Sequence, residues 1–157
     1  MKPTKLTNLA GIALIVAVVG FFVIQLLVGN GLPAPTVAIN IVLIQPSLAL
    51  ILFLSAIPIT RYRSALKKFL DSKGVRPKPV DSNYAIRSLA FAKSVSLTGG
   101  IFVGWQSAIL VYQLLVPQTT SFLTPVLGIL GAITMTVVGI VVENLFRIPP
   151  DRDGDAA

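Results

Sequence analysis

Residues 94–116 read SVSLTGGIFVGWQSAILVYQLLV, a run of 23 residues without a charged side chain. At about 1.5 Å of rise per residue, a helix of this length crosses a hydrocarbon core about 30 Å thick. Similar runs lie at about 6–28, 37–59 and 122–143. Because lipid offers no partner to an unpaired backbone group, each run is predicted to be a transmembrane helix. The sequence therefore predicts an all-α fold, a four-helix transmembrane bundle made of two helical hairpins.

The remaining residues are too few for a second domain. The chain has 157 residues, 54% of them hydrophobic, and a mean hydropathy of +0.84. We therefore expect residues 1–157 to form a single membrane domain. The first apolar run is longer than the 7–15 residues, roughly, of a secretory signal, which favours an uncleaved first helix over a removed signal peptide.

Charge predicts the orientation of the four helices. All 13 Lys and Arg residues lie in three segments, residues 1–5, 61–93 and 147–157, whereas the connections at 29–36 and 117–121 carry no charge. Four crossings place the three charged segments on one side of the membrane, which the positive-inside rule assigns to the cytoplasm. We expect cytoplasmic N- and C-termini, a cytoplasmic basic loop at 61–93 and a cytoplasmic tail at 147–157.

The basic loop is expected to be partly helical. Residues 61–71 form an amphipathic pattern that continues the second helix, and Asp81 or Ser82 can cap a helix that runs on into the third. Anionic lipid headgroups are the expected partners of the loop, because each Lys or Arg near such a surface contributes roughly 1 kcal/mol of attraction. No nucleic-acid recognition motif accompanies the charge, so nucleic acid is not expected as a partner. The candidate lipid contacts are Arg61, Arg63, Lys67 and Lys68.

Small residues recur along the third and fourth helices. Because lipid provides no hydrophobic drive for helices to associate, such rows let two backbones approach closely. Packing within the chain is favoured over a homodimer interface, although the pattern does not decide between them. The candidate packing residues are Ser96, Gly100, Gly104, Gly128 and Ala132.

Glu143, at the end of the fourth run, is the acidic residue placed nearest to the membrane interior. An ionisable group at this depth is costly, so it suggests either an interfacial ion pair or a proton or amine site. Arg147, one turn later on the same helix, is the first choice of partner, and Lys93 is the second. Helix lengths place Lys93 nearer the cytoplasm than Glu143. The ion pair is the favoured interpretation.

Other polar residues lie deep in the apolar runs. Gln45 and Gln106, with Trp105, are candidates for a polar pocket, but interhelical hydrogen bonds are the more frequent use of such amides. Pro46, inside the second helix, predicts a bend. The chain has no Cys and no His, which excludes thiol chemistry and imidazole catalysis. No catalytic, cofactor or metal site is expected.

The chain resembles an actinobacterial integral membrane protein family, domain of unknown function 3180. The likeness lies in Pro3-Thr4 with residues 6–10, in Asp81, Ala85 and Arg87, in Ala92-Lys93-Ser94 with Gly99-Gly100 and Gly104-Trp105, and in Glu143 with residues 147–151. The resemblance implies a four-helix bacterial inner-membrane protein, often encoded beside folate-biosynthesis genes, with no established activity. Phe146 stands where relatives often have Cys, and Ser82 where they have Pro, so no thiol role carries over.

From these observations we expect a multi-pass protein of the bacterial cytoplasmic membrane that is an accessory or scaffold component and not an enzyme. Its expected partners are the bilayer, anionic headgroups, and another membrane protein or a second copy of itself. The alternative is a small carrier, or a protein that binds lipid or a small molecule, with a site near helices two and three.

Overall fold

The computed structural model describes residues 6–72, 82–116 and 122–146. They form four α-helices: α1 (Leu6–Gly29), α2 (Ile39–Ser72), α3 (Ser82–Leu115) and α4 (Leu123–Phe146). Each helix contains a segment that is long and apolar enough to cross a membrane, and the described residues include no strand. The predicted all-α fold with four membrane-capable helices is confirmed.

The helices α2 and α3 are longer than a membrane crossing requires. Each has 34 residues, which corresponds to about 51 Å of helix. The excess lies in the basic segment 61–93, where α2 continues to Ser72 and α3 begins at Ser82. Both expected helical extensions are therefore present. We call residues 61–72 the α2 extension and residues 82–93 the α3 extension.

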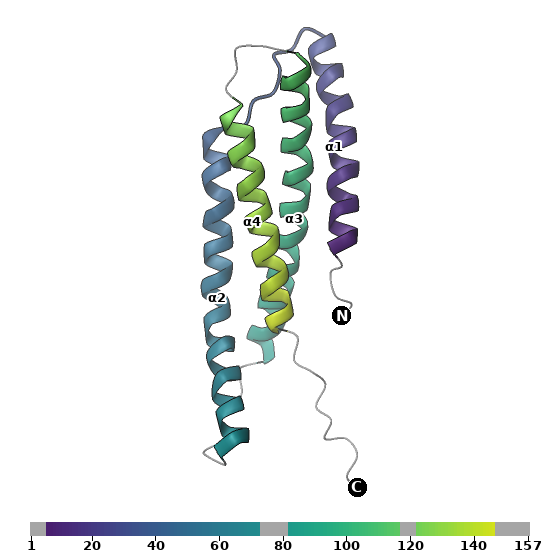
Figure 1. The fold of residues 1–157 in the computed structure, drawn as a ribbon. Coiled ribbons are helices and arrows are strands. Elements are labelled where there is room, and N and C mark those ends of the chain that lie inside the picture. The colour runs from purple at the N-terminus through teal and green to yellow at the C-terminus, as the bar shows by residue number, and fades with distance from the viewer. Residues whose placement is uncertain (1–5, 73–81, 117–121, 147–157) are drawn as a thin grey trace.

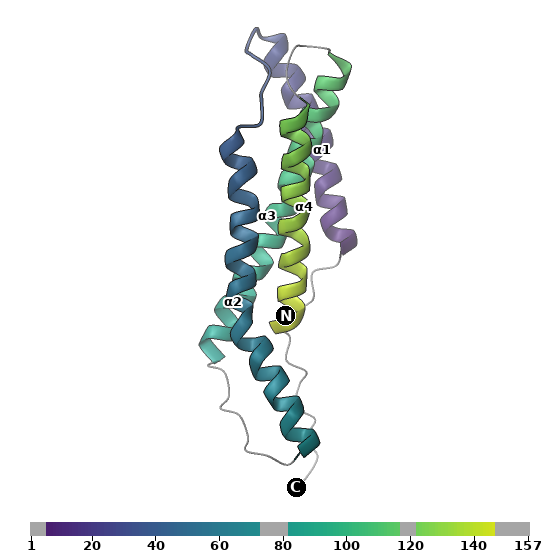
Figure 2. The same ribbon diagram turned by 60° about the vertical axis from the view of Figure 1, so that its left-hand side comes forward.

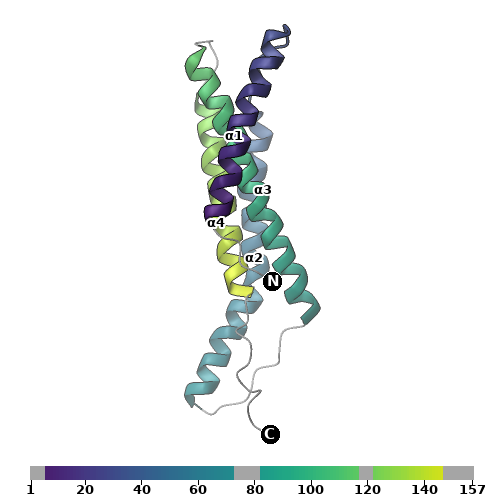
Figure 3. The same cartoon turned by 90° about the vertical axis from the view of Figure 1, so that its right-hand side faces the viewer.

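The four helices lie side by side in the order α1, α3, α4, α2 (Figure 1). Within the described ranges, the backbone of α1 closely approaches that of α3 only, while α4 packs against both α3 and α2. Of the two expected hairpins, α3 and α4 pack directly as an antiparallel pair. By contrast, α1 and α2 are joined by a short connection but separated by the other two helices, as Figure 3 also shows.

Two apolar clusters fill the contacts between the helices. One joins α2, α3 and α4 and contains Ala49, Leu52, Ala56, Ile59, Ala92, Val95, Met135, Val142 and Phe146. The other joins α1, α3 and the start of α2 and contains Ile24, Val37, Val42, Ala108, Ile109 and Tyr112. Most other large apolar side chains are exposed, as expected for faces that meet lipid.

Proline interrupts the hydrogen-bond ladder of α2 twice. Pro46 and Pro58 both lie inside the helix, and each removes a donor to a carbonyl one turn earlier. In Figure 2 the C-terminal part of α2 runs at an angle to the rest of the helix. Near Pro58, the Ser55 hydroxyl donates to the Leu52 carbonyl at 2.6 Å, and the Thr60 hydroxyl donates to the Ile57 carbonyl at 2.8 Å. Neither acceptor is the Leu54 carbonyl, which loses its usual donor at Pro58, and hydroxyl bonds of this kind often accompany a helix bend.

Candidate functional site

The α3–α4 interface is made by small residues from both helices. Ser96 of α3 lies against Gly139 of α4, where an added Cβ would come within 2.7 Å of the serine Cβ. One turn along, Gly99 lies against Thr136, whose hydroxyl would clash with a Cβ at the glycine. The Ser96 and Thr136 hydroxyls each donate to a carbonyl of their own helix, at 2.9 and 2.8 Å. Close approach here therefore depends on missing side-chain volume.

Glycines also form the α1–α3 interface. A Cβ at Gly104 would clash with the Ala13 carbonyl oxygen, and one at Gly20 would lie 3.1 Å from the Ala108 Cβ. Gly100 lies farther along the same interface, where an added Cβ would be 3.5 Å from the Leu9 side chain. Of the candidate packing residues, Gly100 and Gly104 thus face α1. The other three, Ser96, Gly128 and Ala132, lie at the α3–α4 contact.

Gln45 and Gln106 meet α4 from two sides. The Gln106 amide lies over Gly128, with its Cδ 2.8 Å from the position that a Cβ would occupy, and the Gln45 Oε1 lies 2.8 Å from the equivalent position at Gly131. Both side chains are 1% exposed. Their amide nitrogen and oxygen atoms have no hydrogen-bond partner in the described part of the chain. This is a buried polar layer packed on a glycine face.

Trp105 does not join these two glutamines. Its ring packs against Gly20, with Cε3 3.2 Å from the position of an added Cβ, and it belongs to the cluster shared by α1 and α3. Adjacent helical residues point about 100° apart, so Gln106 faces α4 while Trp105 faces α1. The structure therefore brings together two members of the predicted polar pocket and separates the third.

The contacts between α3 and α4 also set the depth of Glu143. Gly139 lies against Ser96, so one further turn brings Glu143 level with Ala92, next to Lys93. The prediction that Lys93 lies nearer the cytoplasm was wrong. It assumed that α4 starts level with the end of α3, whereas the Gly128–Gln106 contact places Leu123, the first residue of α4, about one turn deeper than Leu115, the last residue of α3.

The predicted ion pair itself stays a prediction. Glu143 is buried at 4% exposure, and Lys93 is half-buried at the same depth on α3. Arg147, the first choice of partner, lies outside the described residues. The common depth of Glu143 and Lys93 makes the lysine a stronger candidate than helix lengths indicated.

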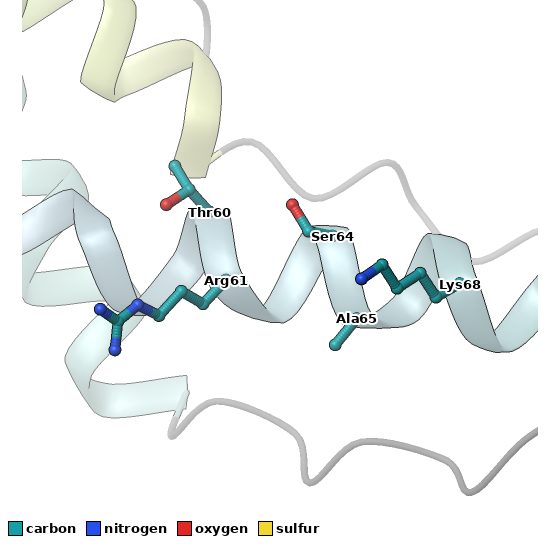
Figure 4. Close-up of a pocket in the computed structure, with 5 residues that line it drawn as sticks. All are labelled: Thr60, Arg61, Ser64, Ala65 and Lys68. Atoms are coloured by element: carbon teal, nitrogen blue, oxygen red, sulfur yellow. The ribbon is translucent and has the colours of Figure 1, made fainter.

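The α2 extension presents a polar stripe. Arg61 and Lys68 are exposed and line a groove of about 320 Å³ together with Thr60, Ser64 and Ala65 (Figure 4). On the other side of the extension, Tyr62, Leu66 and Phe69 are half-buried, so the expected amphipathic character is present. The side chains of Arg63 and Lys67 lie outside the described part of the structure.

A hydrogen bond joins the α3 extension to α2. The Tyr84 hydroxyl, on the α3 extension, donates to the Ser55 carbonyl of α2 at 2.7 Å. This bond crosses from one helix to the other just before Pro58. It therefore holds the α3 extension against the point where α2 bends.

A family described as "Protein of unknown function (DUF3180)" matches residues 9–150. The chain belongs to the DUF3180 family. No curated protein and no solved structure matched the chain. The family resemblance inferred from the sequence motifs is confirmed, and a functional argument for this DUF3180 protein depends on its own residues.

Sequence reasoning missed four residues of this DUF3180 protein that the structure places at contacts. Gly131 was not among the candidate packing residues, and Gly99 was named only in a motif that carries the family resemblance. Tyr84 and Ser64 lie in the basic segment 61–93, where the charge and the amphipathic pattern were interpreted without a contact being assigned to either residue. The signal that could have found Tyr84 is its place on the apolar face of the helix that begins at Ser82.

Proposed function

We propose that the protein is a non-enzymatic accessory or scaffold component of the bacterial cytoplasmic membrane. Its four membrane-capable helices, with cationic extensions on α2 and α3, suit a protein that is held in the bilayer and presents a short cytoplasmic surface. The positive-inside rule supports cytoplasmic termini and a cytoplasmic 61–93 segment. The proposed partners are the bilayer, anionic lipid headgroups, and another membrane protein or a second copy of the chain.

The packing of Gln45 and Gln106 favours a scaffold over a carrier. A carrier requires a cavity near the middle of the membrane, with polar groups that face it. At that depth the polar atoms of Gln45 and Gln106 are shielded from water and press on the glycines of α4. The packing of these two described side chains against Gly131 and Gly128 supports the scaffold over the carrier.

The second candidate is a small carrier or binding protein with a site near α2 and α3. The observation that favours it is the absence of hydrogen-bond partners for the buried amides of Gln45 and Gln106 in the described part of the chain. Buried amides without partners are costly, at about 1–3 kcal/mol for each unsatisfied group, and such costs are tolerated at functional sites. If α4 moved away from α2 and α3, both amides would become available to a polar ligand.

The two candidates are separated by purifying the protein from its native membrane in mild detergent and analysing bound molecules by mass spectrometry. Three proteins are compared: the wild type, the double variant Gln45→Leu/Gln106→Leu, and the control Gln25→Leu, which changes an exposed glutamine of α1. A scaffold retains its protein partner in all three. Removing both buried amides also leaves its thermal stability unchanged or raises it, because no unsatisfied group remains.

The carrier candidate predicts a different pattern. A small polar molecule would copurify with the wild type and with Gln25→Leu but not with the double variant. That result would overturn the scaffold proposal.

A further inference from the structure

The α2 extension begins where α4 ends. Both helices run in the same direction, and Gln45 lies against Gly131, so fifteen residues later Thr60 is level with Phe146, the last described residue of α4. Ile59 and Phe146 belong to the same buried cluster, which supports this alignment. From Arg61 onward, α2 has therefore passed the described end of the helix that covers it.

The groove on this part of α2 is lined by hydrogen-bond donors and positive charge. Its lining residues follow one stripe of the helix, with two cations, Arg61 and Lys68, and the exposed hydroxyl of Ser64 between them. Figure 4 shows the Ser64 hydroxyl and the Lys68 ammonium on neighbouring turns, with both cationic side chains leaning toward the N-terminal part of α2. The lining contains no acidic residue among those described. Such a surface suits an anion.

The depth of the groove relative to the membrane indicates which kind of anion it binds. From Ile39 to Ile59, α2 rises about 30 Å, which matches the thickness of the hydrocarbon core. Arg61 is then the first charged residue beyond the core, and the groove extends about 10 Å farther along the helix. This is the layer in which phospholipid phosphate groups lie.

We propose that the groove formed by Thr60, Arg61, Ser64, Ala65 and Lys68 is a specific binding site for the headgroup of an anionic phospholipid. Ser64 and Lys68 donate hydrogen bonds to the phosphodiester oxygens, and Arg61 adds the second positive charge toward the bilayer. Charge-assisted bonds from Lys and Arg are the strongest that a phosphate group receives from side chains. The inference rests on the proposed function, which already includes anionic headgroups as partners, and adds to it a defined groove with a role for each of its donors.

The test uses the full-length protein in a neutral detergent and titrates it with phosphatidylglycerol, with phosphatidylcholine, or with inorganic phosphate. Lipid adducts are counted by native mass spectrometry, and the shift of the unfolding temperature is measured in parallel. The variants are Arg61→Gln/Lys68→Gln and Ser64→Ala. The matched control is Arg87→Gln, which removes an exposed arginine of the α3 extension that does not line the groove.

Phosphatidylglycerol is expected to bind and stabilise the wild type and Arg87→Gln equally. Each lost cation of the groove should weaken the affinity about fivefold, so the double variant should bind roughly 30-fold more weakly. Ser64→Ala should weaken binding several-fold without changing the unfolding temperature of the lipid-free protein. Phosphatidylcholine and inorganic phosphate should produce no comparable shift.

Three results would overturn the proposal: equal binding of phosphatidylglycerol to the double variant and the wild type, an equal loss in Arg87→Gln, or stabilisation by inorganic phosphate alone. The equal loss in the control would mean that net charge acts without a site. Stabilisation by phosphate alone would mean that the lipid is not the ligand. A failure of the scaffold proposal is distinguishable, because it appears as a copurifying small molecule while the affinity for phosphatidylglycerol persists.

Discussion

At the scale of single residues, Gly104 has the least room for a side chain among the described glycines. A methyl group there meets the backbone of α1 at Ala13, which cannot rotate away as a flexible side chain can. We expect Gly104→Ala to destabilise the protein by about 1–3 kcal/mol, a typical cost of overpacking, and to loosen α1 first. Thermal unfolding in detergent measures this cost.

The control for this prediction is Gly11→Ala on α1. It adds the same methyl group, but no atom of a neighbouring element lies within 4 Å of it. Its unfolding temperature should equal or exceed that of the wild type, because Ala favours a helix over Gly. Equal behaviour of the two variants would mean that Gly104 does not set the distance between α1 and α3.

The second prediction for a single residue concerns Glu143. Its carboxylate is buried at 4% exposure, level with Lys93 on the neighbouring helix. We expect Glu143→Gln to insert normally but to unfold at a lower temperature, because a neutral amide loses the attraction to nearby positive charge. Membrane fractionation checks insertion, and an unfolding profile identical to that of the wild type would contradict the structural role.

At the scale of helices, the bond from Tyr84 to Ser55 should control the mobility of the extensions. Tyr84→Phe removes only the hydroxyl and its hydrogen bond. The free energy that stabilises the helical structure should therefore fall by about 0.5–1.5 kcal/mol or less, and only in the segment after Pro58. Hydrogen–deuterium exchange should become faster in residues 55–72 and remain unchanged in α4. Tyr62→Phe serves as the control, because Tyr62 lies on the same segment and its hydroxyl has no described bond.

The ends of the helices show what the sequence could and could not predict. The extensions of α2 and α3 were predictable from the amphipathic pattern after Arg61 and from the capping residue at Ser82. The relative depth of Lys93 and Glu143 was not, because it depends on the contact between Gly128 and Gln106. A count of residues along each helix contains no information on that register.

At the scale of the whole molecule, the sequence predicted four helices but not their order. In a soluble protein, an apolar stripe shows which face of a helix is buried, but in lipid both the packed and the exposed faces are apolar. Small residues such as Gly100 and Gly104 indicated that α3 packs closely, without indicating the partner. For the same reason, Trp105 could not be assigned to α1 instead of to the glutamine layer.

The prediction for the whole chain concerns the side of the membrane on which each loop lies. Because the sequence has no Cys, single-cysteine variants report one position each. We expect Thr119→Cys to react with a membrane-impermeant maleimide in intact cells, and Lys73→Cys to react only after the membrane is permeabilised. Labelling of both variants in intact cells would contradict the proposed orientation.

The order of the helices also has a consequence for synthesis. When α1 leaves the ribosome, the helix that it packs against does not yet exist, since Gly104 follows Gly20 by more than eighty residues. At a translation rate of about 5–20 residues per second, this delay lasts roughly 4–17 seconds. The same holds for α2, whose partner α4 is made last. Until α3 and α4 are made, α1 and the apolar part of α2 must therefore be stable in the bilayer without their packing partners. The absence of charged residues between residues 6 and 59 makes this possible.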